Sequence, residues 1–225
     1  MSFLGTGVYP LRQAARLVGT DSTAVRRWVL GYKRQGQAYS PLWKPELADA
    51  GLGEPVVSFR DLLELRLVAA FVGHGVGLRV IRATAEFARR EFGTDYPLSS
   101  RRFLTDGKSI FLEAVAAEGN DELMDVPRRQ LVFSTIIRPS LYEGIEYEAG
   151  RARRWYPMGG SGKIVMLDPK VQFGTPIVAS AGIPTDTLHA AFLAEGGERK
   201  AVARIYGVSP QEVDAAVRFE TKLAA

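Results

Sequence analysis

The chain has 225 residues, of which 46% are hydrophobic and 24% are charged, and it contains no cysteine. A chain of this length can bury a substantial core in one large domain or two small ones. The lack of cysteine excludes disulfides and thiolate metal sites and fits a reducing cytoplasm, where we expect the protein to reside. Neither a signal peptide nor a membrane-spanning segment is expected from the sequence.

The basic charge gathers at one end of the chain. The net charge is +4 overall, yet residues 1–45 carry seven lysines and arginines against one acid, Asp21, which is a local charge of +6. A concentrated basic segment is typical of a module that meets phosphates.

Two short helices are predicted within this basic segment. Pro10 suits an early helical position, and apolar residues follow at helical spacing, namely Leu11, Ala14, Ala15 and Val18. Gly19 ends this helix, and Asp21 is an N-cap for a second helix that runs to about Tyr32. Two helices joined by a tight turn that contains glycine indicate a helix-turn-helix.

Residues 31–53 are rich in Gly, Pro and Tyr and predict a loop or wing with short strands. Residues 58–61 form a capping box for a helix that runs to about Val72. Another amphipathic helix follows from Leu78 to Phe92, closed by Gly93. We therefore expect a winged helix-turn-helix over residues 1–94.

The middle of the chain, residues 95–162, is predicted to be a β-rich connecting region. Residues 102–105 and 109–112 flank Asp106-Gly107, a pair that accepts the positive φ of a hairpin turn. An acidic loop is expected at 118–125, whereas 130–137 is ambiguous between strand and helix. Further strands are expected at 145–147, 152–156 and 163–167, with a turn at 159–162 before the last of these. A patch of Arg151, Arg153 and Arg154 is split by the alternation of a strand.

Residues 163–225 are predicted to form a C-terminal unit of three helices shaped like a second helix-turn-helix. The first helix is capped by Thr185 or Asp186, the second covers 198–206, and Ser209 to Glu212 is a capping box for the third. Acids and bases balance here, and acids at the start of the third helix would repel phosphate. We predict that this unit binds protein, through self-association or a partner.

The sequence contains no clear pattern of catalytic or cofactor-binding residues. His74 and His189 lack a second ligand at metal-binding spacing. The glycine-rich turn at 159–162 lacks both the spacing of a phosphate-binding loop and the helix that would follow it. The acids between Glu113 and Asp125 lie in a polar stretch. We therefore expect no catalytic residue, no cofactor, no metal site and no enzymatic activity.

The second helix carries the strongest functional pattern. Arginine reads guanine with two donors at once, and basic residues nearby hold phosphates. Arg26 and Arg27 are assigned to bases, with the apolar Trp28 expected in the core. The full set of candidate DNA-binding residues is Ser22, Thr23, Arg26, Arg27, Tyr32, Lys33, Arg34 and Lys44. A solvated charged face is the alternative reading of the same pattern.

The sequence resembles a known family in several short motifs. Residues 11–28 resemble the first two helices of a MerR-family domain, with Arg26 at the arginine of that pattern and Arg27 in place of its first aromatic. Residues 58–66 and 75–82 resemble the next two helices. The motifs at 167–169, 173–178, 182–184 and 206–209 resemble a small domain of unknown function that is common in bacterial antitoxins. The whole chain resembles a VapB-type antitoxin with an added helix-turn-helix.

This resemblance implies an α+β regulator with three partners. It would bind double-stranded operator DNA, neutralise a PIN-like ribonuclease toxin, and form a homodimer that places two reading helices about one DNA turn apart, or a multiple of it. The alternative is a protein-interaction module that binds a partner without sequence-specific DNA binding. No residues are assigned to toxin binding.

Overall fold

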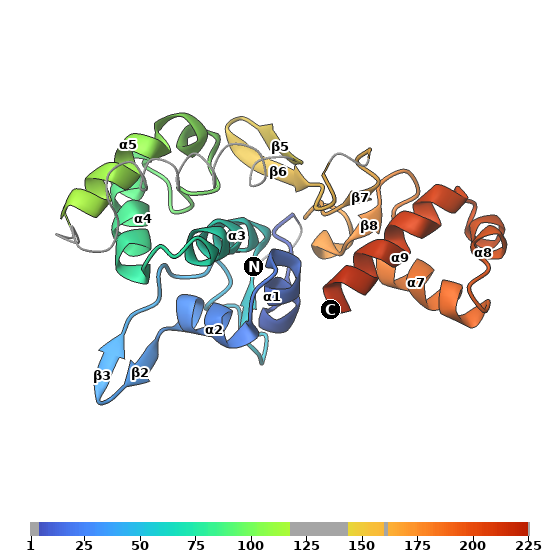
Figure 1. Ribbon diagram of the computed structural model, residues 1–225, viewed down its shortest axis with the longest axis horizontal. Helices are drawn as coiled ribbons and strands as arrows, with labels where there is room; N and C mark the ends of the chain where they lie inside the picture. Colours follow the sequence, from blue (N-terminus) through green and yellow to red (C-terminus); the bar gives the residue numbers. More distant parts are fainter. Residues whose placement is uncertain (1–4, 118–143, 160–161, 225) are drawn as a thin grey trace. The chain divides into compact units, whose positions relative to one another are not determined.

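The computed structural model describes residues 5–117, 144–159 and 162–224 (Figure 1). The chain is α+β, as expected, with helices and small sheets of two or three strands. It divides into two compact units. We call Tyr9–Glu143 with Tyr147–Ala152 the N-terminal unit, and Met1–Val8, Gly144–Glu146 and Arg153–Ala225 the C-terminal unit. The division expected at residues 94 and 162 stays a prediction.

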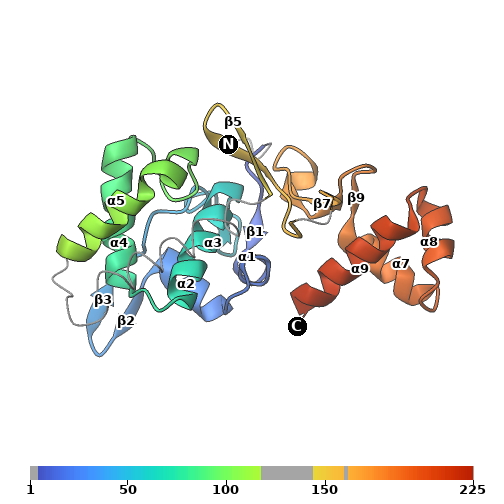
Figure 2. The same cartoon turned by 45° about the horizontal axis from the view of Figure 1, so that its top comes forward.

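The N-terminal unit begins with two short helices, α1 (Leu11–Val18) and α2 (Ser22–Leu30). Helix α1 ends where Gly19 adopts a left-handed conformation, and Asp21 caps α2 by accepting a hydrogen bond of 3.0 Å from the amide of Ala24. Both features were predicted, although α2 ends before Tyr32. An antiparallel hairpin of β2 (Tyr32–Arg34) and β3 (Gln37–Tyr39) follows directly, where short strands were expected (Figure 2).

Helix α3 (Phe59–Gly73) forms the centre of this unit, with nine of its fifteen residues buried. The predicted capping box is present: Ser58 Oγ accepts from the amide of Asp61 at 3.2 Å, and Asp61 Oδ2 accepts from the amide of Ser58 at 2.9 Å. Just before it, β4 (Val56–Val57) pairs with β1 (Tyr9–Pro10). The start of α3 is therefore fixed by both a strand pair and a cap.

Helix α4 (Leu78–Phe92) ends at Gly93 as predicted, but α5 (Arg101–Ala117) replaces the expected hairpin. The prediction of a β-rich region is wrong for this stretch. Asp106 pairs with Arg102 one turn earlier at 3.2 Å. Gly107 is buried against the ring of Phe103, where a Cβ would lie only 2.9 Å from ring carbons. The Asp-Gly pair therefore serves helix packing instead of a turn.

The remaining middle region is described only in part. The acidic loop at 118–125 and the ambiguous segment 130–137 lie outside the described residues, as does half of the turn at 159–162. The expected strands β5 (Ile145–Glu148) and β6 (Arg151–Trp155) form a hairpin. Its turn residues Ala149 and Gly150 have φ of 48° and 77°, the positive values that a two-residue hairpin turn of this kind requires.

The C-terminal unit combines a small sheet with the three expected helices. Strands β7 (Val165–Met166), β8 (Ile177–Val178) and β9 (Ile183–Pro184) form an antiparallel sheet, with a 3-10 turn η1 at Gln172–Gly174. Helices α7 (Thr185–Ala194), α8 (Arg199–Tyr206) and α9 (Pro210–Ala224) pack around a core that includes Leu188, Val202 and Val213 (Figure 2).

The two helix starts predicted in this unit differ in outcome. The capping box of α9 is present, because Glu212 Oε2 accepts from the amide of Ser209 at 2.7 Å and Ser209 Oγ accepts from the amide of Glu212 at 3.3 Å. The predicted cap of α7 is wrong. The helix already includes Thr185 and Asp186, and Pro184 occupies the cap position. The buried Thr185 hydroxyl instead bonds the Pro176 carbonyl at 3.3 Å.

Candidate nucleic-acid interface

Helix α2 separates into a buried side and an exposed side. Val25, Trp28 and Val29 are buried, as expected for the inward face. Arg26 and Arg27 are exposed, and neither forms an ion pair with any of the described residues. At the start of the helix Thr23 is exposed and Ser22 is half-buried. The exposed side of α2 therefore presents hydroxyls near its start, and guanidinium groups in its middle and last turn, to solvent.

A stack of three side chains joins α2 to the hairpin. The guanidinium of Arg27 lies over the ring of Tyr32, 5.7 Å from its centroid. The Tyr32 ring stacks on that of Tyr39, with centroids 4.6 Å apart and planes 6° from parallel. A cation over a ring face is attracted to it electrostatically, so the stack helps to orient Arg27. Tyr32 thus has a positioning role in the structure, and its contact with DNA stays a prediction.

The junction between α2 and the hairpin depends on Gly31. Its φ is 72°, and a Cβ at this position would overlap the carbonyl oxygen of Tyr39 at the far end of the hairpin. The chain after the hairpin returns to α2, where the amide of Leu42 donates to the carbonyl of Trp28 at 2.7 Å. The hairpin therefore leaves α2 and comes back to it within a dozen residues.

An arginine that the sequence did not single out holds the end of the hairpin. Arg82 of α4 donates from Nη1 to the carbonyl of Pro41 at 2.7 Å and from Nη2 to the carbonyl of Ser40 at 2.8 Å. The planar guanidinium suits two neighbouring acceptors. In the sequence Arg82 is one of several arginines on an amphipathic helix, and no signal separates it from the others.

The segment after the hairpin is fixed by the capping acid of α3. Trp43 Nε1 donates to Asp61 Oδ1 at 2.7 Å, and the amide of Glu46 donates to Asp61 Oδ2 at 3.1 Å. Burial raises the pKa of Asp61, partly offset by these hydrogen bonds. The side chain of Asp61 therefore links the hairpin region to the core helix.

The basic residues of the hairpin region differ in their surroundings. Lys33 and Arg34 on β2 are exposed, opposite Ala38 and Gln37. Lys44 forms an exposed ion pair with Asp49 at 2.6 Å. Such exposed pairs typically contribute less than about 1 kcal/mol, so a phosphate can replace the carboxylate. Seven of the eight candidate residues thus lie on α2 and β2, which Gly31 joins, and Lys44 lies beyond them.

The other chemical features considered in the sequence form no site in the described part of the chain. No group of three or more His, Cys, Asp or Glu residues is placed to hold a metal ion among the residues described. His74 is exposed at the end of α3, and His189 is half-buried on α7. Of the acids between residues 113 and 125, only Glu113, exposed on α5, is described. None of the described helices is long and apolar enough to cross a bilayer.

The fold therefore belongs to the α+β class, with an exposed basic helix next to a small hairpin. No protein-family model matches the chain. It is 24% identical over 234 residues to the uncharacterized protein Rv2308 of Mycobacterium tuberculosis, an alignment that covers 98% of this chain and 93% of that protein. The X-ray crystal structure of Rv2018 from Mycobacterium tuberculosis is similar with a TM-score of 0.69 at 22% identity, covering 93% of this chain and 96% of that one. At this identity the likeness shows a shared fold.

Proposed function

We propose that this protein is a sequence-specific DNA-binding regulator in which α1, α2 and the β2–β3 hairpin act as a MerR-like winged helix-turn-helix. One observation carries the proposal: the exposed face of α2 continues into a basic hairpin through the Arg27–Tyr32–Tyr39 stack. The sequence from Ser22 to Trp43 contains no acid at all, so nothing on these elements opposes a phosphate backbone.

Each residue has a defined part in this proposal. Arg26 in the middle of α2 and Arg27 in its last turn bond to base edges in the major groove, where an arginine binds guanine with two donors at once. Ser22 and Thr23 bond to phosphates at the start of the helix. The remaining contacts are made to the DNA backbone by Tyr32, Lys33, Arg34 and Lys44.

We further propose that the protein is the antitoxin of a type II toxin-antitoxin pair, a homodimer that represses its own operon and neutralises a PIN-like ribonuclease. The resemblance of the motifs in the C-terminal unit supports this role. In this proposal the partner contacts the C-terminal unit at Leu193 and Ile205, which are 64% and 61% exposed. If DNA binding fails, an interaction module that binds only a protein partner is the remaining candidate.

The decisive experiment measures binding of the full chain to its own upstream DNA and to an unrelated duplex, by fluorescence anisotropy across a salt series. We expect tight binding to the upstream DNA, and a loss of roughly tenfold or more in the Arg26→Ala/Arg27→Ala variant, because each bidentate base contact is worth about 1–3 kcal/mol. The matched control, Arg218→Ala/Lys222→Ala, removes the same charge from exposed positions of α9. Equal weak binding of both duplexes, or an equal loss in the control, would reject the proposal.

A further inference from the structure

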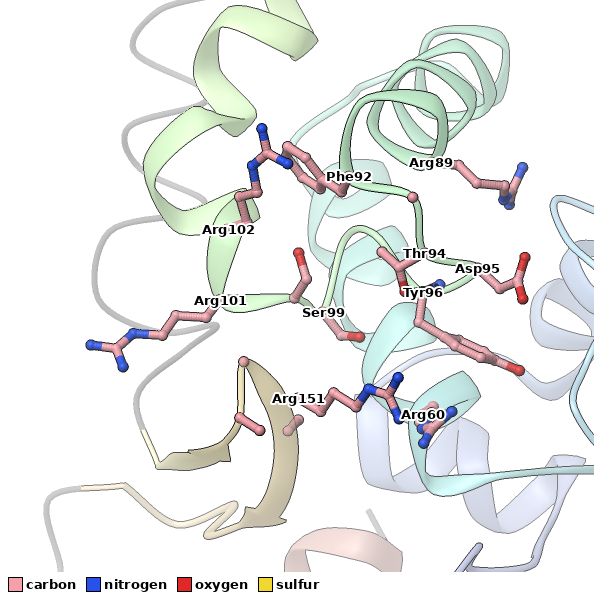
Figure 3. Close-up of a pocket in the computed structure, with 15 residues that line it drawn as sticks. Arg60, Arg89, Phe92, Thr94, Asp95, Tyr96, Ser99, Arg101, Arg102 and Arg151 are labelled. Carbon is pink, nitrogen blue, oxygen red and sulfur yellow. Dashed lines mark hydrogen bonds between the residues drawn. The ribbon is translucent and has the colours of Figure 1, made fainter.

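We propose that a cleft in the N-terminal unit binds a small phosphorylated ligand the size of a nucleotide. The cleft has a volume of about 530 Å³. Its walls come from the start of α3, the end of α4, the segment 93–100, the start of α5 and the tip of the β5–β6 hairpin, all within one unit (Figure 3). None of the eight candidate DNA-contacting residues lines it, so this inference does not depend on the proposed function.

Arginine dominates the lining, which contains five arginines and one acid, Asp95. Arg102 is already neutralised, because its guanidinium pairs with Asp106 at 3.2 Å and with Glu91 at 3.5 Å. Arg101 points away from the cleft in Figure 3. The three arginines that remain to bind a ligand are Arg60, Arg89 and Arg151.

These three arginines are poorly matched by carboxylates. Arg60 has only a distant partner, Glu46 at 3.8 Å, and lies 5.6 Å from the centroid of the Tyr96 ring. The side chains of Arg89 and Arg151 form no ion pair or hydrogen bond with the described residues. Figure 3 shows Arg151 reaching from the hairpin turn toward Arg60. Two guanidinium groups directed at each other repel unless an anion lies between them.

The wall that carries Arg151 is anchored to the rest of the unit. The hydroxyl of Tyr147, four residues earlier, donates to the carbonyl of Ser99 at 3.3 Å. Burial raises the pKa of Tyr147, so the hydroxyl keeps its proton as a donor at neutral pH. The turn between Tyr147 and Arg151 is a tight one, through Ala149 and Gly150. Arg151 is therefore presented from a fixed position.

The chemistry of the lining selects the class of ligand. The guanidinium fork matches phosphate oxygens in pairs, and several such forks suit a group that carries more than one negative charge. A volume of about 530 Å³ lies within the range of sites for small molecules and exceeds what a lone phosphate fills. Phe92 and Tyr96 supply aromatic surface for the uncharged part of the ligand.

The test is isothermal titration calorimetry of the full chain at low salt, with adenosine triphosphate, inorganic pyrophosphate and adenosine as probes. We expect both phosphorylated probes to bind and adenosine not to bind. The Arg60→Gln/Arg151→Gln variant should weaken binding at least tenfold, whereas Arg90→Gln, an exposed neighbour of Arg89 that does not line the cleft, should change it less than twofold. Arg151→Gln alone, on an exposed turn, should weaken binding severalfold without lowering the melting temperature.

Three results would overturn the inference. One is the absence of binding by either phosphorylated probe up to millimolar concentration. Another is equal binding of the phosphorylated probes by wild type and by a folded Arg60→Gln/Arg151→Gln variant, which would mean that the probes bind adventitiously outside the cleft. The third is loss of binding to an unrelated DNA duplex in the same variant without any uptake of the small probes, which would assign the cleft to a nucleic-acid backbone.

Discussion

The indole Nε1 of Trp43 donates a hydrogen bond of 2.7 Å to the buried carboxylate of Asp61. The other oxygen of this carboxylate accepts the amides of Ser58 and Glu46 at 2.9 and 3.1 Å. One side chain therefore caps α3 and fixes the segment that follows the β2–β3 hairpin. The position of the candidate DNA-reading surface depends on an acid that is itself out of reach of DNA.

Asp61→Asn tests this dependence. An asparagine offers one acceptor oxygen and turns an N–H₂ group toward at least one of three donors, two of which are buried. We expect the free energy of unfolding to fall by about 1–3 kcal/mol, measured by urea denaturation followed by circular dichroism. Asp95→Asn, at an exposed position without a hydrogen-bond partner in the described residues, is the control and should change it by less than about 0.5 kcal/mol. Equal effects of the two substitutions would contradict the anchoring role.

The raised pKa of Glu64 predicts how the free energy of unfolding depends on pH. This fully buried side chain accepts the amides of Ser99 and Leu98 at 2.7 and 3.2 Å, and burial raises its pKa from 4.5 to about 7. Between these values the folded chain holds a proton that the unfolded chain has released. The free energy of unfolding should therefore decrease as pH rises from about 5 to 7.5, by on the order of 2–3 kcal/mol, and then level off.

Urea titrations at several pH values measure this slope, and Glu64→Gln supplies the comparison. The amide of this variant cannot titrate, so the variant should lose most of the decline, whatever its stability at a single pH. The pKa of Asp61 is also raised and contributes with the same sign, which leaves a smaller residual slope. A wild-type stability that does not decline across this pH window would show that the pKa of Glu64 is not raised in the folded chain.

Arg82→Ala should loosen the hairpin without unfolding the unit. The substitution leaves the carbonyls of Ser40 and Pro41 to water, because the hydrogen bond to Ser40 is exposed and that to Pro41 is only partly buried. We expect hydrogen exchange at the amides of the hairpin to accelerate severalfold while exchange within α3 stays unchanged, because local opening is governed by local contacts. Arg82→Lys keeps the charge but loses the planar fork and should restore only part of the protection. Unchanged hydrogen exchange in both variants would show that Arg82 does not stabilise the hairpin.

Two glycines of the hairpin region make a matched pair. Gly31 and Gly36 both have positive φ, 72° and 79°, but a Cβ at Gly31 would overlap the Tyr39 carbonyl, whereas nothing lies within 4 Å of a Cβ at Gly36. Gly36→Ala should lower the free energy of unfolding by about 1 kcal/mol, from backbone strain alone. Gly31→Ala should cost more than this, by at least about 1 kcal/mol, and should disrupt the Tyr32–Tyr39 stack, visible in the near-ultraviolet circular dichroism. Equal losses would show that the backbone relieves the overlap at no cost.

The sequence predicts local structure well where a cap and a helical repeat agree. Asp21, the Ser58–Asp61 box and Gly93 each mark a helix end that the structure confirms. The hairpin predicted at Asp106-Gly107 is wrong because it relied on the turn preference of these two residues alone. Phe103, Ile110, Phe111 and Ala114 follow helical spacing around it and are buried on one side of α5. That repeat was the stronger signal, since burial of a helix face outweighs the turn preference of two residues.

The arginine cleft and the hydrogen bonds from Arg82 to Ser40 and Pro41 could not be predicted from the sequence. Arg60, Arg89 and Arg151 come from α3, α4 and the start of β6, and only folding brings them to one cleft. Spacing along the chain carries no information about such distant partners. The stack of Arg27, Tyr32 and Tyr39 was easier to predict, since the three residues lie within thirteen positions of the sequence. Their mutual orientation, however, depends on the positive φ of Gly31.

Arg82 holds carbonyls that lie 41 and 42 positions earlier in the chain. The first 45 residues carry all the candidate DNA-contacting side chains, yet they contain neither this arginine nor Asp61. Residues 1–45 therefore do not form an independently transferable module. Grafting them onto another protein would transfer the basic charge and the helix but leave the hairpin without its two supports. A graft that preserves the structure of the candidate DNA-contacting surface has to extend through α4.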